Sequence, residues 1–121
     1  MDNGLSISGA DGMQRYLDRS EILTSTVDQL RKDLSLALEE FKAPEPGDAA
    51  FEALRGQVFP VLQASADRGD HALKVLMYRV DIPEAHMHRT MTAGGLHALS
   101  GEVVLRALQK VLTRMRFAGR F

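Results

Sequence analysis

The apolar residues between positions 13 and 41 recur at spacings that alternate between three and four, and this repeat constrains the fold more than any other feature. The repeat consists of Met13, Tyr16, Ser20, Leu23, Val27, Leu30, Leu34, Ala37 and Phe41. Such spacing places an apolar stripe along one side of a helix. Because no Pro or Gly interrupts it, the sequence predicts one helix over residues 13–41, about 45 Å long. Asp11 and Gln14 have the spacing of a capping box at its start, whereas a start at Ser25 or Thr26 would halve its length.

A turn separates this long helix from a second one. Residues 42–47 contain two prolines and a glycine, which do not continue a helix. Asp48 is expected to cap the second helix, and Gly69 is expected to close it in the left-handed conformation. Because Pro60 lies inside this helix and removes one backbone donor, we expect either one bent helix or two short ones.

Two shorter helices are expected next. Asp70 is expected to cap a third helix that runs through Val80, and its apolar residues cover most of its circumference, which is typical of a central helix. A short fourth helix begins either after Asp81 as its N-cap or with Pro83 as its first residue. The glycine pair at positions 94 and 95 is expected to end it.

The last helix is predicted over residues 100–117. Its apolar residues cover an arc of about 200° on a wheel of 3.6 residues per turn, about twice what one contact requires. We therefore expect this helix to be packed on two sides. No alternating strand pattern of sufficient length is found. The sequence predicts an all-α fold, a bundle of about five helices with one long N-terminal helix and a long amphipathic C-terminal helix.

Composition indicates one globular domain, because 45% of the 121 residues are apolar. Residues 1–10, which are rich in Gly and Ser, are expected to form a flexible N-terminal arm, and residues 11–121 a single helical domain. The absence of Cys excludes disulfides, thiolate zinc sites and cysteine nucleophiles. With no secretory pattern and no apolar run near 18 residues, we expect a cytoplasmic protein without a membrane partner.

Charge is distributed unevenly although the net charge is only −1. Residues 1–60 carry eleven acidic and six basic side chains, and residues 61–121 carry five and nine. Arg106, Lys110 and Arg114 are four apart and line one face of the last helix, where they could bind phosphates. Few aromatic residues accompany them and no groove-reading motif is present. The favoured interpretation is a solvated face paired with carboxylates such as Asp18, Asp28, Glu39 or Glu40.

Histidines provide the only candidate metal ligands. Glu84 and His88 are four apart on a helix and could share an ion, with His97 or His71 as a third ligand. His86 and His88 point to opposite sides of a helix and cannot chelate one ion. The ordinary interpretation is surface or partly buried histidines, so the sequence predicts no bound metal and no cofactor.

Function is expected to lie in binding rather than catalysis. No nucleophile motif, phosphate loop or acid–base set is present, so the chain is not expected to be an enzyme. Ile22 and Leu36 lie off the main stripe and fourteen residues apart, and together they form a candidate partner surface. Because a 45 Å helix exceeds what the short helices cover, a second copy is expected to pair with it as a homodimer. The sequence favours a protein–protein interaction or adaptor module, with nucleic-acid binding and metal binding as alternatives.

Overall fold

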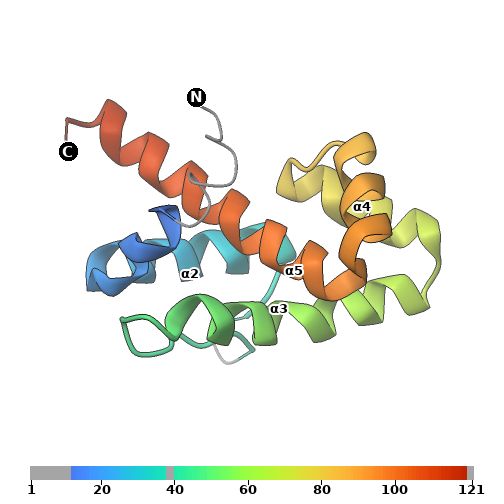
Figure 1. The fold of residues 1–121 in the computed structure, drawn as a ribbon, viewed down its shortest axis with the longest axis horizontal. Coiled ribbons are helices and arrows are strands. Elements are labelled where there is room, and N and C mark those ends of the chain that lie inside the picture. The colour runs from blue at the N-terminus through green and yellow to red at the C-terminus, as the bar shows by residue number, and fades with distance from the viewer. Residues whose placement is uncertain (1–11, 38–39, 120–121) are drawn as a thin grey trace.

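The computed structural model describes residues 12–37 and 40–119, and within these ranges the chain is helical with no strand (Figure 1). A 3-10 turn, η1 (Arg15–Asp18), leads into α2 (Ser20–Leu34), and three further helices follow: α3 (Ala50–Asp67), α4 (Asp70–Val80) and α5 (Glu84–Phe117). This confirms the all-α class and the bundle. No described helix is long and apolar enough to cross a membrane.

The C-terminal half of α5 is the central element of the bundle. It packs against α3 on one side and α2 on the other, while α4 contacts α3, α5 and α2 (Figure 1). The prediction that the last helix is packed on two sides is confirmed. The side chains that α5 contributes to these contacts are almost completely buried: Leu99, Val103, Val104, Ala107, Leu108 and Val111. Their burial is the main apolar contribution of α5 to the stability of the fold.

The single long helix predicted over residues 13–41 is wrong, and its first break lies at η1. After η1 the backbone of Arg19 is extended, with φ −94° and ψ 121°, so α2 starts afresh at Ser20. The break exchanges the residues that face the core. Leu17, which lay off the predicted stripe, is fully buried, whereas Ser20, which lay on it, is exposed. Because of the break, the Ser20 hydroxyl group stays exposed to water, and the free-energy cost of burying it is avoided. The predicted Asp11 cap lies outside the described residues.

The second break ends α2 at Leu34, because Ser35 adopts the left-handed conformation with φ 56° and ψ 49°. This conformation costs a non-glycine residue about 1–2 kcal/mol. Burial of Phe41 offsets the cost, since the chain folds back and this ring becomes fully buried. Arg31 holds the returning chain by donating from Nε to the carbonyl oxygen of Phe41 at 2.8 Å. α2 is thus about 22 Å long at 1.5 Å per residue, roughly half the predicted length.

Hydrogen bonds to its main-chain atoms hold the loop that follows Phe41. The Gln57 side chain of α3 accepts a hydrogen bond from the Lys42 amide at 2.9 Å and donates one to the Lys42 carbonyl at 2.7 Å. Further along, the Gly47 amide donates to the Leu17 carbonyl at 3.3 Å. These contacts fix the path of the loop between α2 and α3.

The sequence left open whether the second helix is one bent helix or two short ones. The structure shows a single helix, α3, with Pro60 inside it. Because Pro60 has no amide hydrogen, the carbonyl group of Gly56 loses its helical hydrogen-bond donor. Both residues are exposed, so water can bind that carbonyl. The predicted caps are displaced by one residue. Ala49 rather than Asp48 precedes α3, and Asp70 is the first residue of α4 rather than its cap.

The turns around α4 also differ from the prediction. Gly69 has φ 121° and ψ 165°, which is not the left-handed helical conformation. Asp81, expected as an N-cap, instead ends α4 in the left-handed conformation, with φ 70° and ψ 40°. Pro83 immediately precedes α5 and is its N-cap. Neither alternative for this helix start is therefore correct.

α5 contains a sharp change of direction at Gly95, where φ is 68° and ψ is −159°. The predicted break at the glycine pair is confirmed, but the helix resumes directly after Gly95 instead of near Ser100. His86 Nε2 lies 2.9 Å from Glu102 Oε1. In a straight helix these residues would be about 24 Å apart, so residues 84–94 turn back beside the residues that follow (Figure 1).

Replacement of Gly95 tests this change of direction. The Gly95 backbone conformation is nearly restricted to glycine, so we expect Gly95→Ala to lower the free energy of unfolding by about 1–3 kcal/mol. Gly56→Ala is the matched control. A Cβ at Gly56, in the middle of α3, has no neighbour within 4 Å, and we expect stabilisation of about 0.5–1 kcal/mol. Urea denaturation of both variants measures these changes, and a neutral Gly95→Ala would contradict the assigned backbone.

Candidate functional site

A partly buried cluster of polar side chains joins α2, the turn after α4 and α5. The Asp33 cluster, as we name it, comprises Gln29, Asp33, Asp81, Lys110 and Arg114. Lys110 Nζ lies 2.9 Å from one carboxylate oxygen of Asp33 and 3.1 Å from one of Asp81. Gln29 donates to the second oxygen of Asp33 at 2.9 Å and accepts from Arg114 at 2.7 Å. The side chains of Asp33 and Lys110 are only 7% and 15% exposed.

The predicted basic stripe is thus engaged inside the fold. Lys110 and Arg114 bind α2, and the third member, Arg106, donates to the Asp81 carbonyl at 3.3 Å and to the Gln109 side chain at 2.8 Å. Only Lys110 has carboxylate partners, Asp33 and Asp81, and neither was among those expected from the sequence. The four carboxylates named from the sequence include Glu39, which lies outside the described residues. Because Lys110 is paired and mostly buried, its ammonium is not available to bind phosphates.

The candidate metal ligands are engaged with other side chains. Glu84 is bound by Lys74 at 3.5 Å and by His88 at 3.4 Å. Arg55 donates to Nε2 of His97 at 2.8 Å, which occupies the lone pair that a metal would need. Within residues 12–37 and 40–119, no group of three His, Asp or Glu side chains could hold an ion. The structure therefore does not bring Glu84, His88 and His97 together as one metal site.

Arg55 fixes the packing of α3 on α5 rather than forming a site. Its guanidinium lies 5.0 Å from the centre of the Phe51 ring and pairs with Glu52 at 3.3 Å. A Cβ on Gly101 would lie 2.6 Å from Nη2 of Arg55. The glycine thus lets the arginine lie directly against the α5 backbone. Nε of Arg55 is buried and has no hydrogen-bond partner among the described residues.

The predicted partner surface of Ile22 and Leu36 is only partly supported by the geometry. Ile22 is 2% exposed and belongs to the core, so its placement on a partner surface is wrong. The apolar residues of the predicted stripe in α2 are buried as well, so the error arises because the buried face of α2 is wider than one stripe and includes Ile22. Leu36 lies beyond the end of α2 and is partly buried against the core.

Leu36 also lines a surface groove between the end of α2, α3 and α4. The groove has a volume of about 500 Å³. Leu34, Leu36, Val61 and Leu76 provide its apolar lining. Arg68 and Arg79 line it as well, and both are exposed. Arg68 donates to the Ser65 hydroxyl at 3.1 Å, and Arg79 donates to the Ser35 hydroxyl.

Exposed apolar side chains lie on α4, the helix that forms one wall of this groove. Tyr78 is 81% exposed and Val75 is 45% exposed. The expectation that α4 is a central helix is therefore wrong, since its outer face is open to solvent. Val75 and Tyr78 are three residues apart and share one side of the helix. A third large exposed apolar residue, Phe117, lies at the opposite end of the chain, at the end of α5.

Comparisons with known proteins provide no assignment for this site. No protein-family model, curated protein or solved structure compared with the chain matches it. The candidate site is therefore defined by geometry alone. We call Val75, Tyr78 and the adjoining groove the α4 surface, with Arg68 and Arg79 as its charged members.

The Asp33 cluster generates a stability prediction. Lys110→Met leaves the buried carboxylate of Asp33 without its cation, and such a loss costs about 3–5 kcal/mol where burial is complete. Because Gln29 still donates to Asp33, we expect a loss of about 2–3 kcal/mol in the free energy of unfolding. Lys32→Met is the matched control at an exposed site, where a change within about 0.5 kcal/mol is expected. Equal effects of the two substitutions in urea denaturation would argue against the cluster.

Glu84 generates a prediction about pH. The hydrogen bond from His88 and the charge of Lys74 lower the pKa of Glu84 below its ordinary value of 4.5. The unfolded chain therefore binds a proton more readily than the folded protein. This group stabilises the fold above pH 4.5, and that contribution is lost as the pH falls through the lowered pKa. We expect Glu84→Gln and His88→Gln to flatten the fall in melting temperature between pH 5.5 and pH 3; an unchanged profile would contradict the contact.

Proposed function

We propose that this chain is a protein–protein interaction or adaptor module that binds its partner through the α4 surface. The observation that carries the proposal is the combination of exposed Val75 and Tyr78 with an apolar groove beside them. Aromatic and aliphatic side chains at the centre of an interface contribute most of its binding energy. Tyr78 also has a hydroxyl group, so its side chain can be hydrated in the free protein and its ring can pack against apolar groups in a complex. Catalysis is not part of the proposal.

Burial of Val75 and Tyr78 against a partner is energetically more favourable than their exposure to water. Burying an apolar side chain of this size contributes about 1.5–3 kcal/mol. Two such residues share one face of α4, and the same helix lines a groove of about 500 Å³ with the neighbouring residues Leu76 and Arg79. Concave apolar sites of roughly 300–1,000 Å³ are of the size that binds ligands. These features support the choice of α4 over the other described helices.

Self-association stays a separate prediction. It was expected because a 45 Å helix needed cover, and that argument no longer applies to an α2 of about 22 Å. If a homodimer forms, we propose that it forms through the α4 surface, and light scattering of the purified protein measures its mass. We place the module in the cytoplasm, a location that fractionation of cells producing the tagged protein tests.

Charge introduced on the α4 surface tests the proposal. We expect the double variant Val75→Glu/Tyr78→Glu to keep its helicity and melting temperature, because both residues are exposed, and to lose proteins that co-purify with the wild type. Thr113→Glu/Phe117→Glu is the matched control, since it also introduces two negative charges, at exposed residues away from α4. Quantitative mass spectrometry of the captured proteins compares the three forms. Retention by the α4 double variant, or equal loss from both variants, would rule out this surface.

A further inference from the structure

The charges around the groove identify the chemistry of the partner. Arg68 and Arg79 line the groove, and each donates a hydrogen bond to a neutral hydroxyl group, on Ser65 and Ser35 respectively. Neither guanidinium forms an ion pair with any carboxylate in residues 12–37 and 40–119. Carboxylate partners are found for four described lysines and arginines, which are Arg31, Arg55, Lys74 and Lys110. The groove is therefore apolar in its lining and basic at its edges.

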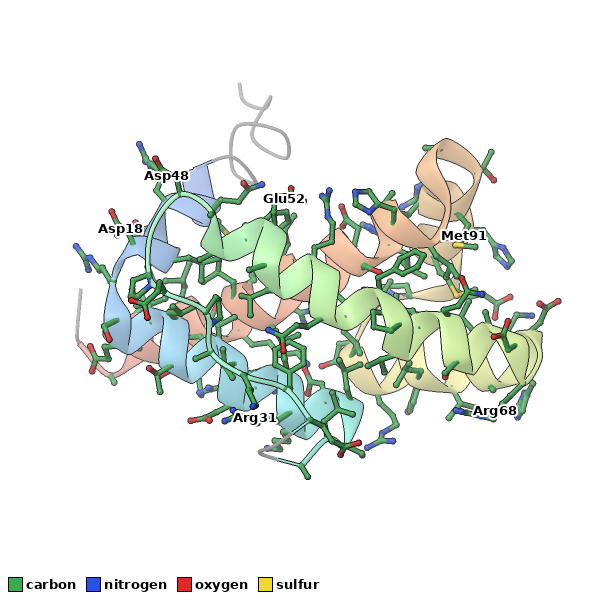
Figure 2. All side chains as sticks on the ribbon, turned by 90° about the horizontal axis from the view of Figure 1, so that it is seen from below. Asp18, Arg31, Asp48, Glu52, Arg68 and Met91 are labelled. Carbon is green, nitrogen blue, oxygen red and sulfur yellow. The ribbon has the colours of Figure 1, made fainter. Side chains whose placement is uncertain are left out.

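The two guanidiniums lie toward opposite ends of the groove. A two-residue turn, Arg68 and Gly69, joins α3 to α4, so the end of α3 lies beside the start of α4. Arg68 immediately follows α3, at the turn, and Figure 2 shows it at the far end of the molecule from Asp18 and Asp48. Arg79 lies in the last turn of α4, about 15 Å from that turn at 1.5 Å per residue. The charged positions are thus separated by the length of two to three helical turns.

From these positions we propose that the groove binds an acidic amphipathic helix of a partner protein. The partner's apolar side chains pack on Leu36, Val61 and Leu76, and carboxylates two to three turns apart on the same helix pair with Arg68 and Arg79. Arginine is suited to this role because its planar fork binds a carboxylate through two hydrogen bonds. The inference rests on the proposed function and names the class of partner that this function requires.

The size of the groove favours a helix as the occupant. Its α3 wall extends from Pro60 to Arg68, about 12 Å along the helix axis, which equals slightly more than two helical turns. An amphipathic helix binds such a groove through side chains at positions i, i+3, i+4 and i+7. A peptide that binds by strand addition would instead need a free strand edge, and the described residues contain no strand.

Two designed peptides test the charge requirement. Both are fluorescein-labelled helical peptides with the same leucine stripe, and their flanking positions carry Glu in one and Lys in the other. We expect wild-type protein to bind the Glu peptide at least about tenfold more tightly, because the like charges of the Lys peptide and the groove repel each other. Rising salt is expected to reduce this preference. Equal binding of the two peptides, or binding of neither, would overturn the inference.

Charge reversal in the groove completes the test. Arg68→Glu/Arg79→Glu is expected to reverse the preference toward the Lys peptide, as measured by fluorescence anisotropy. Arg89→Glu/Arg116→Glu, which changes the net charge equally at two exposed arginines outside the groove, is expected to keep the wild-type preference. If both double variants lose it equally, the effect is one of net charge and the inference fails. Arg68→Gln/Arg79→Gln serves as a second variant should the reversal unfold the protein, and it must abolish the preference.

The outcomes separate this inference from the proposed function. If partner capture is lost in Val75→Glu/Tyr78→Glu but kept in Arg68→Glu/Arg79→Glu, the module stands and the acidic helix is wrong. If neither variant affects capture, the proposed function fails as well. Light scattering adds a further outcome, because a dimer that dissociates on reversal of Arg68 and Arg79 would identify a second copy as the occupant and overturn the acidic partner.

Discussion

The fold depends on burying two apolar sides of one helix at the same time. The C-terminal half of α5 places Val103, Val104, Ala107 and Leu108 in the core, and a helix of this kind is unstable unless both sides are covered. α3 covers one side and α2 the other. α4 and the folded-back residues 84–94 then cover the remaining apolar surface near the start of this half of α5. The order of the elements along the chain follows from this requirement, because each short helix must return to α5.

Apolar packing alone does not fix how far α2 slides or rotates on α5, and the Asp33 cluster supplies that information. A carboxylate with 7% exposure tolerates only an arrangement in which its cation and its hydrogen-bond donor meet it. Lys110 and Gln29 satisfy the two oxygens of Asp33, and Lys110 also binds Asp81 in the turn after α4. One ammonium group thereby connects three elements. The same contacts occupy the Lys110 ammonium group, which belongs to the predicted basic stripe.

Sequence patterns predicted the elements better than their ends. The two-sided burial of the last helix and the break at the glycine pair followed directly from periodicity and from the conformational freedom of glycine. The breaks at Arg19 and Ser35 could not be predicted, since neither residue is a Gly or Pro and both breaks are stabilised by distant groups, such as Arg31 binding the Phe41 carbonyl. The spacing of the apolar residues between positions 13 and 41 does not indicate either break.

The candidate site was predicted only in part for a similar reason. Leu36 and Ile22 were both identified because they lay off the apolar stripe, but the buried face of α2 is wider than that stripe and includes Ile22. Val75 is one of the apolar residues from which a central helix was expected, and no local pattern distinguishes an exposed valine from a buried one. The arrangement of Arg68 and Arg79 is a property of the α3–α4 pair, so it requires the turn at Gly69 to be known.

The loop after Phe41 has a practical consequence. Its course is determined by main-chain atoms of Lys42 and Gly47, which Gln57 and the Leu17 carbonyl hold. The exposed side chain of Ala43 takes no part in these bonds. In a chain without cysteine, a single thiol introduced at this alanine would be a unique attachment point for a dye or a spin label. Such a probe would report on partner docking without altering the helices that enclose the core.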